Sequence, residues 1–187
     1  MALRLRICFL ATVVLAALVL VPGAFARKAN TVFDGGTAAE RAQVTRALEA
    51  SSFDWRNLPQ TVTVHIGRGM ASEATPGNVW LDANLLDSGR FSWGVVQHEF
   101  AHQVDFLLLT DAQRTTLARL LHASTWCVDT VPDMPHADYG CERFASTLAW
   151  AYWQSPDNVM KPTGRTDESA AVPPAAFRSV LKGMLTR

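Results

Sequence analysis

The chain has 187 residues, of which 49% are hydrophobic and 18% are charged. This composition is that of a folded globular protein and excludes an intrinsically disordered chain. Lys plus Arg equals Asp plus Glu, at 17 each, so no basic surplus indicates a nucleic-acid partner or an anionic membrane surface.

The N-terminus has the three parts of a secretory signal peptide. Arg4 and Arg6 precede an apolar run at residues 7–21, and residues 24–26 (Ala-Phe-Ala) form a small-x-small cleavage site. The apolar run has about 15 residues, fewer than the roughly 20 that a spanning helix needs. We therefore predict a signal peptide at residues 1–26, a secreted or extracytoplasmic location, and no stable membrane association after cleavage. The alternative is a chain anchored by an uncleaved N-terminal helix.

The remainder, residues 27–187, is long enough for one domain with a sizeable core. Residues 27–36 are polar and contain glycine, which predicts a flexible start. Thr37 and Glu40 have the spacing of a capping box, and apolar residues at helical spacing follow them. A first helix is therefore predicted to begin here.

Two short strands are predicted next. Residues 61–66 alternate and are rich in β-branched side chains, and residues 78–82 are also apolar and β-prone. Between them, residues 67–77 contain Gly and Pro and are predicted to form a loop.

Helices dominate the rest of the pattern. The predicted helices are a central one at about 92–109, one that a capping box opens at Thr110, one at 141–154, and a last one after Pro173 that ends at Leu185. Residues 123–140 and 155–172 are polar, without a clear period, and are predicted to be loops. The fold class is therefore α+β, mainly helical, with a small sheet before the central helix.

A metal-binding motif lies on the predicted central helix. His98 and His102 are four residues apart, so both imidazoles share one face of the helix and can reach one ion. Glu99 follows the first histidine and can act as general base toward a water that the metal activates. The neighbouring apolar residues predict a buried helix whose histidines line an internal cleft.

Zinc in a catalytic site needs a third protein ligand. Glu142 is the favoured candidate, because it begins a separate helix with a stripe of small residues that permits close helix packing. Asp105 lies about 10 Å along the helix from His98, so we interpret it as a hydrogen-bond acceptor behind the ligands or as a surface residue. His122 and His136 are the remaining alternatives.

The motif at residues 98–105, followed at a distance by Glu142-x-Phe-Ala, resembles the compact gluzincin metallopeptidases. It is most similar to the catalytic domain of the anthrax-toxin lethal-factor type, over residues 93–153. The resemblance implies a zincin-like fold, Zn²⁺ on His98, His102 and Glu142, and Glu99 as the base. The implied substrate is a peptide or protein.

The same resemblance implies an oxyanion-stabilising tyrosine shortly before the third ligand. Tyr139 is the nearest match, although its spacing to Glu142 differs from the family's, and His136 is the alternative for this role. The predicted strand at residues 79–82 corresponds to the edge strand that pairs with extended substrates in such folds.

Cleavage of the signal peptide would remove Cys8 and leave only Cys127 and Cys141. Two cysteines in an exported domain predict a disulfide, which would anchor the start of the helix that carries Glu142. Free thiols, or cysteines that bind the metal, are the alternatives.

A second function also fits the sequence, namely a non-catalytic exported binding domain that retains a metallopeptidase-like fold. A purely structural helical domain with a chance motif is a third, and it predicts no bound zinc.

Overall fold

The computed structural model describes residues 30–127 and 134–186. The predicted signal peptide at residues 1–26 lies outside these ranges. Within them, no helix has both the length and the apolar character needed to cross a membrane.

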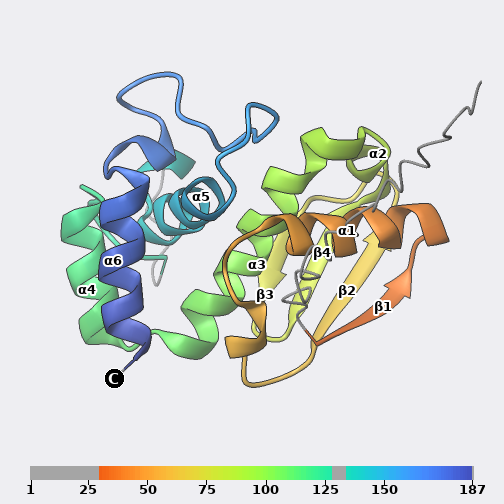
Figure 1. Cartoon of the computed structure of the whole chain (residues 1–187), viewed down its shortest axis with the longest axis horizontal. Coiled ribbons are helices and arrows are strands. Elements are labelled where there is room, and N and C mark those ends of the chain that lie inside the picture. The colour runs from red at the N-terminus through yellow and green to blue at the C-terminus, as the bar shows by residue number, and fades with distance from the viewer. Residues whose placement is uncertain (1–29, 128–133, 187) are drawn as a thin grey trace, which may run out of the picture.

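A four-stranded sheet with the order β1-β2-β4-β3 forms one part of the molecule (Figure 1). Its strands are β1 (Thr31–Gly35), β2 (Val62–Gly67), β3 (Glu73–Thr75) and β4 (Asn78–Asp82). β1 and β4 run parallel to β2, whereas β3 is antiparallel to β4. Buried and partly exposed residues alternate along β2 and β4, so one face of the sheet belongs to the core.

The sheet confirms both predicted strands and corrects three other expectations. The flexible start predicted for residues 27–36 is wrong at residues 31–35, which form β1, and residues 27–29 lie outside the described ranges. The loop predicted at residues 67–77 contains β3. Residues 79–82 are not an edge strand, because β3 pairs with β4 along its outer side. β1 and β3 are short and largely exposed, so their pairing with neighbours, and not their own hydrophobic pattern, makes them strands.

The helices follow the predictions closely. They are α1 (Ala38–Ala50), α2 (Ala83–Leu86), α3 (Trp93–Leu108), α4 (Asp111–Leu120), α5 (Gly140–Tyr152) and α6 (Pro174–Leu185). Only the one-turn α2 was not expected. Capping boxes open α1 at Thr37 and α4 at Thr110, as predicted. The fold is therefore α+β, with the small sheet formed before the long central helix.

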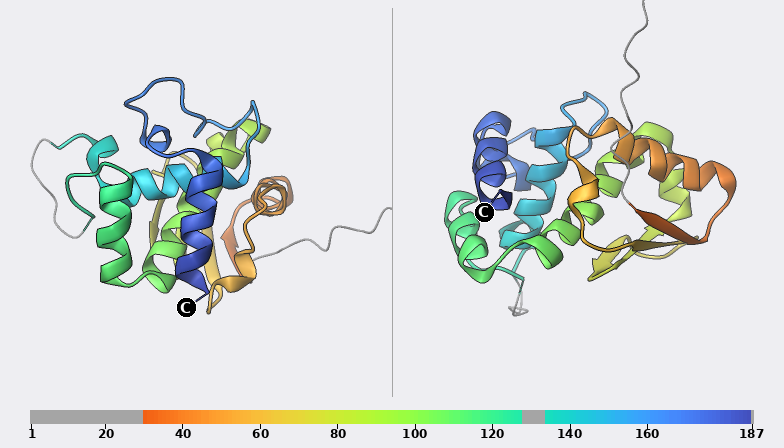
Figure 2. Two further views of the ribbon diagram at one scale, coloured as in Figure 1. Left: turned by 60° about the vertical axis from the view of Figure 1, so that its left-hand side comes forward. Right: turned by 60° about the horizontal axis from the view of Figure 1, so that its bottom comes forward.

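Helix α3 occupies the middle of the molecule (Figures 1 and 2). The sheet, α1 and α2 lie on one side of it, and α4, α5 and α6 lie on the other. α3 contacts α5 on the helical side and α1, β3 and β4 on the sheet side. Its Phe100 is fully buried and meets Trp55 edge to face, with ring centroids 5.8 Å apart. Because α3 is covered from both sides, its polar side chains are also held inside the protein.

Candidate metal centre

Helix α3 presents three polar side chains to the interior. His98, Glu99 and His102 are only 6%, 5% and 7% exposed. His98 and His102 are one turn apart on the same face, as their spacing predicted, and their ring centroids lie 4.8 Å apart. Burial of three ionisable groups on one turn costs free energy unless the groups are paired or bind an ion. This part of α3 therefore needs a charged or hydrogen-bonding group from another element.

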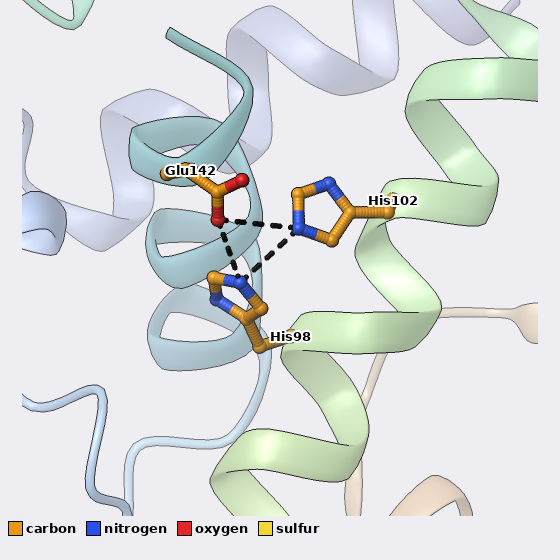
Figure 3. A group of neighbouring side chains, drawn as sticks. All are labelled: His98, His102 and Glu142. Carbon is orange, nitrogen blue, oxygen red and sulfur yellow. Dashed lines mark hydrogen bonds and ion pairs between the residues drawn. The ribbon is translucent and has the colours of Figure 1, made fainter. Parts of the chain in front are cut away.

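Helix α5 supplies that partner. Its first turn carries Glu142, and the predicted stripe of small residues, Ala145, Ser146 and Ala149, is buried. Small side chains allow the two helix backbones to approach closely; α3 and α5 are in contact, and Ser146 of the stripe meets His98 of α3. The approach brings the Glu142 carboxylate to the two imidazoles (Figure 3).

Three ligand atoms converge at one point. Glu142 Oε2 lies 3.1 Å from His98 Nε2 and 3.3 Å from His102 Nε2, and the two nitrogens are 3.2 Å apart. Zinc bonds of about 2.0–2.1 Å in a tetrahedral arrangement place neighbouring ligand atoms about 3.3–3.4 Å apart. The triangle therefore has the size and the donor chemistry to hold a metal ion with three protein ligands. A His98, His102 and Glu142 cluster able to hold a metal ion is present.

The ionisable groups of the cluster shift one another's pKa values. Burial acts to raise the pKa of Glu142, but hydrogen bonds and charges from His102 and His98 outweigh it and hold that pKa far below the usual range. Burial also opposes the charge on His102, yet Glu142 and then Glu99 raise the pKa of His102 overall. Desolvation is the main reason that the pKa of Glu99 is raised. The site thus combines an ionised ligand carboxylate with a second carboxyl group that binds protons readily.

The cluster opens into a cavity of about 650 Å³. Glu99 lies on its wall beside the two histidines, and Glu73 and Ala74 of β3 line it from the sheet side. No residue of β4 is part of the lining, so the strand next to the cavity is β3 and not the predicted strand at residues 79–82. His136, from the short 3₁₀ helix His136–Asp138, also reaches the cavity, and its Nε2 lies 3.1 Å from Glu142 Oε2.

Two other candidate residues lie apart from this cavity wall. Tyr139 is the N-cap of α5 and is not among the residues that line the cavity. His122 is exposed just after α4, in a left-handed conformation with φ of 56°. Of the two residues considered for the oxyanion, the structure therefore places His136, and not Tyr139, on the cavity wall.

Asp105 is neither a metal ligand nor a surface residue. It is 2% exposed and accepts hydrogen bonds from Arg114 Nε at 2.7 Å and from Trp126 Nε1 at 3.0 Å. These donors come from α4 and from the segment that follows it. Of the two alternatives predicted for Asp105, the surface position is wrong; Asp105 is a buried acceptor, but its donors are Arg114 and Trp126 and not the histidines of the cluster. Its contacts tie α3 to its neighbours on the helical side.

Two residues to which the sequence analysis gave no role at the metal also lie at the site. Ser146 Oγ lies 3.0 Å from His98 Nδ1, on the side of the ring opposite Glu142. Glu168, from the predicted loop at residues 155–172, lines the cavity and contacts both Ser146 and His136. Ser146 could have been found from its position four residues after Glu142, whereas nothing in the sequence around Glu168 points to this site.

Cys127 and Cys141 lie at disulfide distance, with Cα atoms 5.6 Å apart. Cys141 directly precedes Glu142, and its Sγ lies 3.3 Å from Glu142 Oε1. This is the predicted pair, and it sits at the first turn of the helix that carries the third ligand.

Replacement of both cysteines by serine is expected to lower the free energy of unfolding by about 3 kcal/mol, the value for a closed loop of this size. Zinc affinity should fall as well, because the start of α5 loses its tether. Chemical denaturation and zinc titration of the double variant measure the two effects. Alkylation of two free thiols in the native protein would contradict the bond, and unchanged zinc affinity would contradict its role at the site.

Comparisons of the chain with protein-family models, curated proteins and solved structures find no match. The resemblance to gluzincins therefore rests on the motif residues alone and stays a prediction.

Proposed function

We propose that the protein is an exported zinc-dependent peptidase with His98, His102 and Glu142 as metal ligands and Glu99 as general base. The observation that carries the proposal is the convergence of the three ligand atoms within 3.1–3.3 Å of one another at the wall of a cavity. Two imidazoles and one carboxylate form a common donor set of catalytic zinc sites, and three protein ligands leave a position open for water or substrate.

Zinc, when bound, would activate a water and polarise the scissile carbonyl. Glu99 is the group of this chain that handles the proton. It lies on the cavity wall outside the ligand triangle, and its raised pKa suits a carboxylate that accepts a proton and then delivers it to the departing amine.

His136 is the group best placed to donate a hydrogen bond to the carbonyl oxygen as negative charge develops there. Its Nε2 faces the ligand cluster, and its side chain is 67% exposed, so it is accessible to a substrate. Tyr139 remains the alternative that the resemblance implies.

Strand β3 offers an edge to which a peptide substrate could bind. β3 is the terminal strand of the sheet, and its residues Glu73 and Ala74 line the cavity. An extended peptide can add to such an edge by backbone hydrogen bonds, which would lead its scissile bond past Glu99.

The function is tested by incubating the purified mature protein with a peptide library, with and without a chelator. Cleavage that stops with the chelator and returns with zinc supports the peptidase, and the Glu99→Gln protein prepared in parallel controls for contaminating proteases. Zinc binding without cleavage would favour the non-catalytic binding domain. Absence of both would refute the metal site itself.

A further inference from the structure

We propose that Glu168 is a positioning residue of the metal centre, which uses one carboxylate oxygen to fix the ligand His98 through Ser146 and the other to fix His136. The inference rests on the proposed function for the chemistry of the site. It extends that function to the segment between α5 and α6, which lies outside the motif.

Two paths of hydrogen bonds lead away from Glu168, and we call them the first and the second arm. The first arm joins Glu168 to His98 through Ser146. His98 Nδ1 is 3.0 Å from Ser146 Oγ, and Ser146 Oγ donates to Glu168 Oε2 at 2.5 Å. A histidine that binds a metal through Nε2 carries its proton on Nδ1. His98 would therefore donate to Ser146, and the single hydroxyl proton of Ser146 would go to Glu168. Every donor in this chain has an acceptor, and the chain ends on a carboxylate, which is a common final acceptor for the proton of a zinc-binding histidine.

The second arm runs from Glu168 to His136. Glu168 Oε1 lies 2.8 Å from His136 Nδ1, while His136 Nε2 is directed to Glu142 Oε2 at 3.1 Å. His136 stands on a one-turn 3₁₀ helix, and its side chain is 67% exposed, so packing does little to orient its ring. The carboxylates of Glu168 and Glu142 therefore set the direction in which His136 Nε2 points.

The backbone that carries Glu168 is itself well held. Glu168 begins the 3₁₀ helix Glu168–Ala170, and the next residue, Ser169, is buried and donates to the carbonyl of Met160. Before it, the Asp167 carboxylate accepts backbone hydrogen bonds from Thr163 and Gly164. The segment predicted as a loop is therefore internally hydrogen-bonded, and this preorganisation lets one side chain orient two others.

The role requires a carboxylate, since both oxygens accept hydrogen bonds at once. A glutamine of the same shape offers one acceptor oxygen, and its amide group would face a donor on the other arm. Glu168→Gln is therefore the informative change, because it keeps the size of the side chain while breaking one arm.

The test measures zinc affinity by competition with a chromophoric chelator. Glu168→Gln is expected to weaken zinc binding by about 10- to 100-fold, the effect typical of partners behind a metal ligand, with the far-ultraviolet circular dichroism and Tm of the fold retained. Glu49→Gln, which removes an exposed carboxylate on α1, is the matched control and should bind zinc as the parent does. In a Ser146→Ala background the loss from Glu168→Gln should become much smaller, because the first arm is already broken.

The second arm has its own readout. In protein labelled with ¹⁵N-histidine, the signals of the His136 ring nitrogens in Glu168→Gln should differ from those of the parent, because Nδ1 loses its carboxylate partner. Unchanged zinc affinity in Glu168→Gln, or losses that simply add in the double variant, would overturn the coupling through Ser146. An unchanged His136 spectrum would overturn the second arm. A parent protein that binds no zinc would instead refute the proposed function.

Discussion

Replacing His98 or His102 with alanine is expected to reduce bound zinc from an equimolar amount to almost none. Each imidazole would supply one of three ligand atoms, which lie 3.1–3.3 Å apart, and a catalytic zinc with an open position depends on all three protein ligands. Metal analysis of the variants after dialysis measures the loss. Near-equimolar zinc in either alanine variant would show that the imidazole does not bind the metal.

The third ligand is tested by the contrast between Glu142 and Asp105. Glu142→Ala should weaken zinc binding as severely as loss of a histidine. Asp105→Ala should instead cost stability, because it leaves Arg114 and Trp126 without their buried acceptor. The loss should be about 3 kcal/mol at most, the lower end for a broken buried pair, because Arg114 is still 22% exposed. The reverse order of effects on zinc would mean that the ligand is wrongly chosen.

Glu99→Gln is expected to retain zinc and to lower the rate of peptide hydrolysis by about 10²- to 10⁴-fold, the contribution typical of a general base. Glutamine keeps the shape of the buried side chain but cannot accept and return a proton. Because Glu99 is outside the ligand triangle, the metal content should not change. Steady-state kinetics together with metal analysis separates the two properties, and a Gln variant with full activity would remove Glu99 from the mechanism.

The parts of the site that could be predicted are those that local periodicity determines. The four-residue spacing of His98 and His102 requires only that residues around them form a helix, and the apolar pattern of α3 indicates one. Glu142 was found because the small residues that follow it predict a close helix–helix contact. The capping boxes of α1 and α4 are equally local signals.

The parts that could not be predicted depend on contacts between distant segments. β1 and β3 have little hydrophobic alternation and become strands only beside β2 and β4. Asp105 has the spacing of a residue near the metal, but its donors come from α4 and the segment beyond. Glu168 is 22 residues from Ser146 and reaches the site through a turn-rich segment without periodicity. Such tertiary arrangements leave no regular pattern in the sequence.

Zinc titration of the metal-free mature protein, followed by metal analysis after gel filtration, tests directly whether His98, His102 and Glu142 bind a metal. We expect equimolar zinc that stays with the protein through filtration and is removed by a strong chelator. Protein that retains no zinc under these conditions would contradict the assignment of His98, His102 and Glu142 as a metal centre, and with it the proposed peptidase.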